Sequence, residues 1–377
     1  MPNFIDRLSE QVERKQQTLL HTLKSDVNSA EVSLRDLVNQ NWHAPLPPAA
    51  TERRPAFAVD GSRAVRHLAN GAYLFVAQAL MIGEHNDTRN EEIDVDVAIL
   101  PGATDSSLID RSAGFLMHRL EVKLAREFAE RAPRGSVIFL DGALYGQLTS
   151  LYEWTANAEA ELPRDIFELP QEILDHYMRL FHACAERNLV LISIAKTSHE
   201  VAHGEVWWEN TFGGEMPKDK HVSDSEAIYR WTNRRAGYST PILFGKRSFF
   251  RGARRNLQDS MSIQVQDAPA IVSFFVRLAD FDDALRIDVP ASCLGRAEKI
   301  GEVEKEQVLI HSAVHPILEL LLTDYGGLEV YNSLLYSVDR EVRLKQDIMD
   351  QVYHSVIQDM LGIEMPLDRS ERRFHSR

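Results

Sequence analysis

AFAVDGSR, residues 56–63, is the stretch that decides the fold expected of this chain. A run of apolar residues stops at Asp60, and a glycine, a serine and an arginine follow. GSVIFLDGALYG, residues 135–146, repeats the pattern with Asp141 and Gly142. Each stretch predicts a buried strand that ends in an Asp-Gly turn. Open α/β sheets bind ligands at such strand ends, so the two aspartates are either a paired metal site or two ordinary turns.

The sequence around these two strands predicts a mixed α/β sheet with helices on its faces. The strands are predicted from apolar runs or from apolar–polar alternation, and the helices from an apolar stripe. Such an order places helices against both faces of a sheet. The further strands are expected at 72–83, 92–101, 189–198, 270–278 and 285–290, and the helices at 112–133, 168–188 and in a tail from about 305 to 362.

Three regions are expected along the chain. Residues 1–50 are a helical region, with two helices or one helix broken near Ser25–Ser29, that packs on the core or makes a dimer contact. Residues 51–345 form the core, and a polar, aromatic and irregular insertion at about 199–260 interrupts it. Residues 346–377 are a C-terminal helix and polar tail.

Composition narrows the class of protein. The 377 residues carry 42 Lys and Arg against 56 Asp and Glu, a net charge of −14, which excludes an indiscriminate polycation but permits local basic grooves. Cys184 and Cys293 lack zinc spacing and suit a reducing compartment, although one disulfide is not excluded. No signal sequence or long apolar run is present, so a cytoplasmic location without a membrane span is expected. No GxxxxGK[ST] motif occurs, and we therefore expect no nucleotide-hydrolysing site in this chain.

Two more residues could join the aspartates. Glu121 borders the apolar stripe of the 112–133 helix, where it either turns toward the sheet or pairs with a neighbouring cation in solvent. Lys196 follows the 189–198 strand and either holds a phosphate at the same sheet edge or is an exposed turn residue. Carboxylates on two strands and a helix are the oxygen ligands that Mg²⁺ and Mn²⁺ prefer, and such ions catalyse phosphodiester hydrolysis.

Basic and aromatic residues gather in the insertion. Phosphates bind cations and bases stack on rings, so this mixture favours single-stranded nucleic acid over a merely solvated loop. With Arg63 beside the first Asp-Gly pair, the expected nucleic-acid contacts are Arg63, Arg234, Arg235, Lys246, Arg247, Phe249, Phe250, Arg251, Arg254 and Arg255.

Taken together, these motifs resemble the NurA nuclease family. The resemblance lies in AVDGS at 58–62, the helix with Glu121, VIFLDGAL at 137–144, ISIAKTS at 192–198 and YNSLLYSVDREVRL at 331–344. It implies an RNase H-like core and a manganese-dependent (or magnesium-dependent) nuclease for 5′ to 3′ DNA end resection. It also implies a homodimer that works with a HerA-type hexameric translocase, which supplies the ATP hydrolysis.

The resemblance also assigns site residues. The acidic metal ligands of the family fall on Asp60, Glu121 and Asp141, and its C-terminal tyrosine falls on Tyr331. The family often has a histidine ligand where this chain has Asp339, an oxygen donor that can still bind Mn²⁺. Two alternatives to the repair nuclease stay open: a catalytically silent DNA-binding partner of the translocase, and the same chemistry used against foreign DNA.

Overall fold

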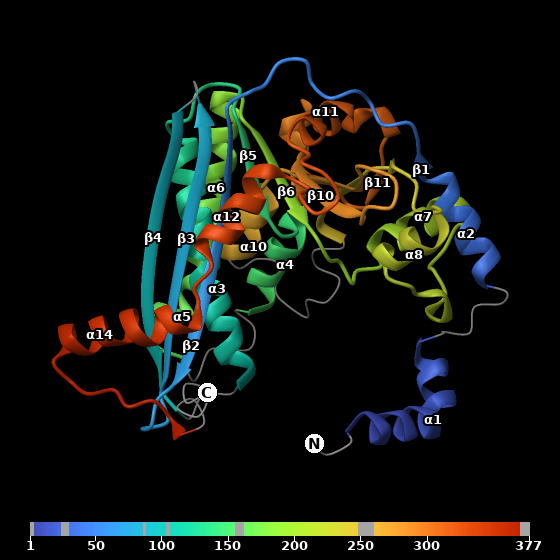
Figure 1. Cartoon of the computed structure of the whole chain (residues 1–377). Helices are drawn as coiled ribbons and strands as arrows, with labels where there is room; N and C mark the ends of the chain where they lie inside the picture. The colour runs from blue at the N-terminus through green and yellow to red at the C-terminus, as the bar shows by residue number, and fades with distance from the viewer. Residues whose placement is uncertain are drawn as a thin grey trace.

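The structure is a computed structural model of the chain and describes residues 4–23, 30–85, 88–102, 106–154, 162–247 and 260–369. Within these ranges one sheet runs through the molecule in the order β1-β7-β9-β10-β6-β5-β2-β3-β4, with β8 and β11 attached beside β9 (Figure 1). The strands are β1 Trp42–His43, β2 Ala56–His67, β3 Tyr73–His85, β4 Thr88–Leu100, β5 Val137–Asp141, β6 Val190–Ala195, β7 Gly237–Ser239, β8 Ile242–Phe244, β9 Ile271–Arg277, β10 Leu285–Pro290 and β11 Gln307–Val308.

Helices cover both faces of this sheet. α3 and α6 lie against one face, and α11, α12 and α14 lie against the other. The helices are α1 Phe4–Leu23, α2 Ala30–Gln40, α3 Ser106–Ala129, α4 Leu144–Trp154, α5 Arg164–Phe167, α6 Leu169–Arg187, α7 Ala202–Phe212, α8 Asp224–Trp231, α10 Ser260–Asp267, α11 His315–Thr323, α12 Ser333–Val342, α13 Gln346–Ile348 and α14 His354–Leu361.

The middle of the sheet combines two kinds of pairing. β4, β3 and β2 form an antiparallel meander, whereas β2, β5 and β6 run parallel to one another. β10 then pairs antiparallel with β6. The expected mixed sheet with helices on its faces is therefore confirmed. The RNase H-like description stays a prediction, which this order of strands supports.

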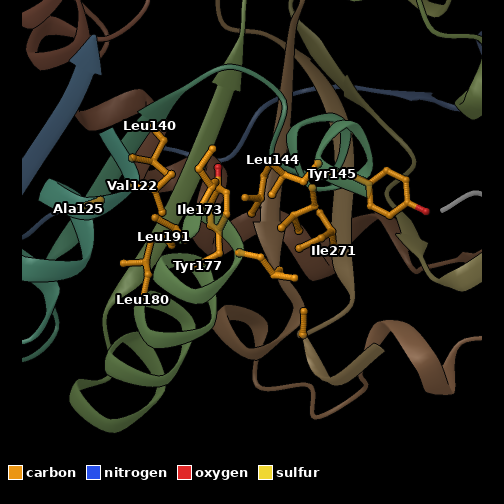
Figure 2. Packing of buried hydrophobic residues seen from close by; sticks show 14 of the residues in the cluster. Val122, Ala125, Leu140, Leu144, Tyr145, Ile173, Tyr177, Leu180, Leu191 and Ile271 are labelled. Carbon is orange, nitrogen blue, oxygen red and sulfur yellow. The ribbon is translucent and has the colours of Figure 1, made fainter. Parts of the chain in front are cut away.

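Alternation along β2 separates the two cores. Phe57 and Val59 face α3 and α6, where Figure 2 shows part of the larger cluster, including Leu140 and Tyr177. Ala58, from the other face of the strand, packs in the cluster that contains α11 and α12. Because side chains alternate along a strand, Asp60 faces the α12 side and Gly61 faces α3.

The prediction that the first strand ends at Asp60 is wrong. β2 continues to His67 because β3 pairs with it along its whole length. Its parallel partner β5 pairs only as far as Val59 with Leu140. Asp60 therefore lies where the parallel pairing stops, in the middle of a long strand, and only Asp141 ends its strand.

The region at 199–260 is more regular than its polar sequence indicated. It contains α7, α8, β7 and β8, and residues 248–259 lie outside the described ranges. Trp207, Trp208 and Trp231 are buried and join the larger core. These tryptophans are core residues of a small helical layer, which α2 also contacts.

The two ends agree with the expected helices. The N-terminal region has two helices on either side of residues 24–29, which lie outside the description. The C-terminal tail contains α11, α12 and α14, with β11 as an additional short strand. Both cysteines are free thiols. Among the helices of the described ranges, none has the length and apolar composition to cross a membrane.

Candidate metal centre

Strand register brings the two aspartates together. Val59 pairs with Leu140 in the parallel β2–β5 ladder, so Asp60 and Asp141 follow it side by side. Both face the α12 side, since Ala58 and Phe139, two residues earlier, belong to that core. Each carboxylate accepts a hydrogen bond from the amide of the following glycine, at 2.8 Å in Asp60 and 2.9 Å in Asp141. The predicted pair therefore exists, with one member in mid-strand.

Glu121 reaches this pair from the opposite face. α3 packs on β2, and Gly61 lies directly beneath the Glu121 side chain. A Cβ at Gly61 would stand 2.6 Å from Glu121 Oε1 and 2.7 Å from Met117 Cγ. The absence of a side chain at residue 61 thus lets the Glu121 carboxylate lie directly against the backbone of β2.

Crowding of the three carboxylates raises the pKa of two of them, Asp60 and Glu121. Burial, then repulsion by Asp141 and by Asp339, raises the pKa of Asp60 to about 7, against the lowering effects of the Gly61 amide and of Lys196. Burial, then Asp60 and Asp141, raises the pKa of Glu121 well above its usual range. Mutual repulsion of this kind is relieved by a cation.

Lys196 supplies one positive charge at the same edge. Its ammonium lies 3.0 Å from Asp141 Oδ2 and 5.3 Å from the centre of the Tyr331 ring. Burial alone would lower the pKa of Lys196, but Asp141 and Tyr331 together raise it. The side chain keeps 41% of its exposure, so it can still meet a ligand. Sequence reasoning placed Lys196 at this edge, and the family resemblance assigned Tyr331 to the site; in the structure the two side chains lie side by side.

Asp339 approaches the centre from α12. It lies close enough to contribute to the raised pKa of Asp60. Its Oδ2 also accepts a contact of 3.4 Å from Arg343, one turn later on the same helix. Asp339 is therefore near the carboxylates, and its role as a ligand stays a prediction.

The donor set suits a hard divalent cation by chemistry rather than by preformed geometry. The acidic residues of the centre offer carboxylate oxygens, the ligand type that Mn²⁺ and Mg²⁺ prefer. Within the described ranges no three His, Cys, Asp or Glu side chains already surround one point as metal ligands.

Among the predicted nucleic-acid contacts that the structure describes, Arg63 is the one carried by a strand of this centre. Arg63, on the Gly61 side of β2, contacts Asp110 at 2.9 Å. The others that the structure describes are each paired within the protein: Arg234 with the Phe281 carbonyl, Arg235 with Asp280, Lys246 with Glu304, and Arg247 with Glu209. Phe249, Phe250, Arg251, Arg254 and Arg255 lie outside the described residues. A role in nucleic-acid binding stays a prediction for all of them.

Sequence reasoning missed a buried ion pair that joins two loops of the centre. Arg286 and Asp288 on β10 are almost fully buried, and Arg286 Nε donates to Asp288 Oδ1 at 3.0 Å. Asp288 accepts from the Tyr145 amide in the segment after Asp141, and Arg286 contacts Glu200 in the segment after Lys196. Two charges inside the apolar strand LRIDVP were the available signal.

The fold and site define a class: a mixed-sheet α/β domain with a carboxylate cluster and a lysine at one sheet edge. The NurA domain family matches residues 54–342, and the chain belongs to this family. The resemblance inferred from the sequence motifs is therefore confirmed.

Solved structures share the fold. The NurA nuclease from Sulfolobus solfataricus superimposes with a TM-score of 0.60 and 15% identity, over 96% of this chain and 98% of that chain. A structure of NurA bound to dAMP and manganese gives a TM-score of 0.56 and 14% identity, over 97% and 99% of the two chains. Among curated proteins, none matches this sequence. At such low identity the likeness concerns the fold.

Proposed function

We propose that this chain is a metal-dependent deoxyribonuclease with Mn²⁺, or Mg²⁺, as its cofactor. The observation that carries the proposal is the meeting of Asp60, Glu121 and Asp141 with Lys196 at one edge of the sheet. Membership of the NurA family and the manganese and dAMP in a related structure support it.

The protein's own residues have distinct roles in this reaction. When bound, the cation supplies Lewis-acid activation of the phosphodiester and of water. Asp60, Glu121 and Asp141 hold it, and Asp339 is the candidate fourth ligand. Lys196, held by Asp141, binds the scissile phosphate and offsets its charge. The basic residues predicted between 230 and 255, with Arg63, guide the strand.

The biological setting is part of the same proposal. The chain processes DNA ends in 5′ to 3′ resection during repair, in the cytoplasm, together with a HerA-type hexameric translocase. Its core is residues 51–345, with the helical region 1–50 and the tail 346–377 outside it. The family resemblance supports this setting. The sequence contains no nucleotide-binding loop motif, so the partner supplies the ATP hydrolysis that drives translocation.

Cleavage of end-labelled DNA tests the chemistry. Single- and double-stranded substrates are incubated with Mn²⁺, Mg²⁺ or EDTA, with and without a HerA-type hexamer. Cleavage should require the cation and should fall at least about 100-fold in Asp60→Asn, beyond the 10- to 100-fold typical of supporting groups. Asp165→Asn, an exposed acid on α5, is the matched control and should retain activity.

Each outcome decides between the candidate functions. Cation-dependent cleavage lost in Asp60→Asn supports the nuclease, and the order of the products separates exonuclease from endonuclease action. No cleavage under any condition, with DNA binding retained, leaves the catalytically silent partner. Equal activity of Asp60→Asn and wild type would show that the carboxylate centre does not catalyse the cleavage.

The homodimer has a candidate surface. Ile93, Val95, Val97 and Ile99 on β4 expose 42% to 76% of their area. Val97 pairs with Val76, and Ile99 pairs with Leu74. These two β3 residues are buried in the cluster that α14 joins, so α14 covers β3 while the same face of β4 stays open. We propose that a second copy of the chain covers this β4 face.

A further inference from the structure

A chain of hydrogen bonds lies behind the carboxylate centre and is not explained by its chemistry. His118 Nε2 lies 2.7 Å from the Tyr177 hydroxyl, which donates to Gln147 Oε1 at 2.9 Å. Gln147 Nε2 then donates to the Asp141 carbonyl at 3.3 Å. Three helices, α3, α6 and α4, contribute one side chain each, and the chain ends on the backbone of a predicted metal ligand.

One arrangement of protons satisfies every bond. Because the Tyr177 hydroxyl donates to Gln147, its oxygen accepts from His118, which must therefore carry its proton on Nε2. Burial lowers the pKa of His118 to about 4, so the ring is neutral at physiological pH. The donors thus point in one direction, from α3 toward Asp141. Reversing the Gln147 amide would set its oxygen against the Asp141 carbonyl oxygen, so this arrangement has no equal alternative.

Both ends of this series of hydrogen bonds lie on elements that carry a predicted metal ligand. His118 precedes Glu121 by three residues, so the two share a face of α3. Burial, then the charge of Glu121, raises the pKa of Tyr177, which places the Tyr177 hydroxyl near that carboxylate. At the other end Gln147 lies over Gly142, where a Cβ would stand 2.6 Å from Gln147 Nε2. The hydrogen bonds therefore link the helix that carries Glu121 to the turn that carries Asp141.

We propose that Tyr177 is a positioning residue that, through Gln147, fixes the Asp141 turn relative to Glu121 so that both carboxylates can bind one divalent cation. The inference rests on the proposed function, because it needs the cation to bind at this centre. Groups that orient metal ligands contribute roughly 10- to 100-fold to metal affinity. Tyr177 is fully buried and touches neither substrate nor solvent, so it acts only through its neighbours.

Tyr177→Phe tests this role, with Tyr145→Phe as its matched control. Both tyrosines are buried in the same cluster, and Figure 2 shows the Tyr145 ring directed away from Tyr177. The Tyr145 hydroxyl donates to the Gly245 carbonyl at 2.7 Å, and Asp60, Glu121 and Asp141 are not among the charges that shift its pKa. Each variant thus loses one buried hydroxyl and keeps its ring, so the cost to folding should be similar.

The first readout is Mn²⁺ affinity, measured by calorimetry on the full chain without DNA. We expect Tyr177→Phe to bind Mn²⁺ about 10- to 100-fold more weakly than wild type, and Tyr145→Phe to bind like wild type. Gln147→Met should reproduce the loss, since it keeps the length of the side chain and removes both hydrogen bonds. Gln147→Met also tests the positioning role if Tyr177→Phe does not fold.

The outcomes separate this inference from the proposed function. If wild type binds no Mn²⁺, the proposed function fails and the positioning role fails with it. If wild type binds Mn²⁺ and both Tyr177→Phe and Gln147→Met bind equally well, only the positioning role is overturned. Equal weakening in Tyr145→Phe would also overturn it, because the effect would then be a general loss of core stability.

Discussion

At Asp60 the stability of the fold and the chemistry of the site oppose one another. Burial and the neighbouring Asp141 raise the pKa of Asp60 to about 7, so an ionised Asp60 destabilises the metal-free protein. A divalent cation removes that repulsion and is bound more tightly for it. Natural sequences retain such unfavourable groups where function requires them.

Asp60→Asn should therefore stabilise the metal-free protein above pH 7. A free aspartate ionises near pH 4 and the folded Asp60 near pH 7, so the unfolded state holds fewer protons and wild-type stability falls as pH rises across this window. In EDTA at pH 8 the variant should gain roughly 1–4 kcal/mol, and less at pH 5. Urea denaturation measures both values, and a gain that did not grow with pH would contradict the assignment.

Manganese should reverse the ranking of the two proteins. Added Mn²⁺ should raise the Tm of wild type, because only the native carboxylates bind it together. Asp60→Asn should show little or no rise, and the exposed Asp165→Asn should behave as wild type does. Differential scanning calorimetry over a range of Mn²⁺ concentrations measures the shift, and an equal rise in Asp60→Asn would exclude Asp60 as a ligand.

His118 should make the fold sensitive to acid. Burial lowers its pKa from 6.5 to about 4, so between these values the unfolded chain takes up a proton that the native protein does not. Stability is complete above pH 6.5 and declines as pH falls toward 4, by roughly 3 kcal/mol from this residue. His118→Gln keeps a donor and does not titrate. Its stability should fall less between pH 7 and 4.5 in denaturation curves, and parallel curves would refute the prediction.

At the scale of elements, the contact between α3 and β2 decides the site. α3 lies over β2, and Gly61 lets it approach closely enough for the Glu121 carboxylate to lie against the strand. The sequence places a glycine there as part of an apparent turn. Its structural reason is a close approach between a helix and a strand, because β2 is extended through residue 61.

Gly61→Ala should damage the centre more than the fold. The new methyl group would stand 2.6 Å from Glu121 Oε1 and 2.7 Å from Met117 Cγ, so the flexible carboxylate must move away. We expect a stability loss of about 1–3 kcal/mol and a large loss of Mn²⁺ binding. Gly114→Ala is the control on α3, since its methyl group meets nothing nearer than 3.9 Å and should stabilise the helix by about 0.5–1 kcal/mol. Unchanged Mn²⁺ affinity in Gly61→Ala would refute the requirement for this close approach of Glu121 to β2.

At the scale of the whole molecule, β4 and α1 are among the described elements that leave apolar side chains uncovered. The β4 face continues a sheet surface that α14 covers only over β3. α1 also exposes Phe4, Ile5 and Leu8, and Figure 1 shows this helix apart from the rest of the chain. Contiguous apolar surface of this kind marks an interaction site in a soluble protein. A dimer through β4 leaves α1 available for a further contact.

Val95→Lys should shift the protein toward the monomer. A lysine at the centre of the open β4 face would be desolvated in a two-fold interface and would meet its own copy nearby. Ile263→Lys on α10 makes the same change at a similarly exposed position elsewhere. Light scattering after size exclusion gives the mass of each. A wild-type monomer, or a Val95→Lys dimer as stable as wild type, would exclude this interface.

The sequence by itself determined the main strands and helices of the sheet and the residues that lie together at the candidate metal centre. Apolar runs and helical stripes are local patterns, so the sheet, the 168–188 helix and the strand before Asp141 could be predicted from them. Asp60, Asp141 and Lys196 could be selected because they follow apolar runs, and Glu121 because it borders the apolar stripe of a helix; the family resemblance then assigned the three acids as metal ligands.

Only the tertiary structure decided how these residues are held. It placed Asp60 in mid-strand, buried the tryptophans of the 199–260 region and paired Arg286 with Asp288 inside the core. It also joined His118 to Tyr177, 59 residues away in the chain. No local pattern encodes such contacts, because a strand continues or ends according to its neighbours, and a buried polar group finds its partner wherever packing brings one.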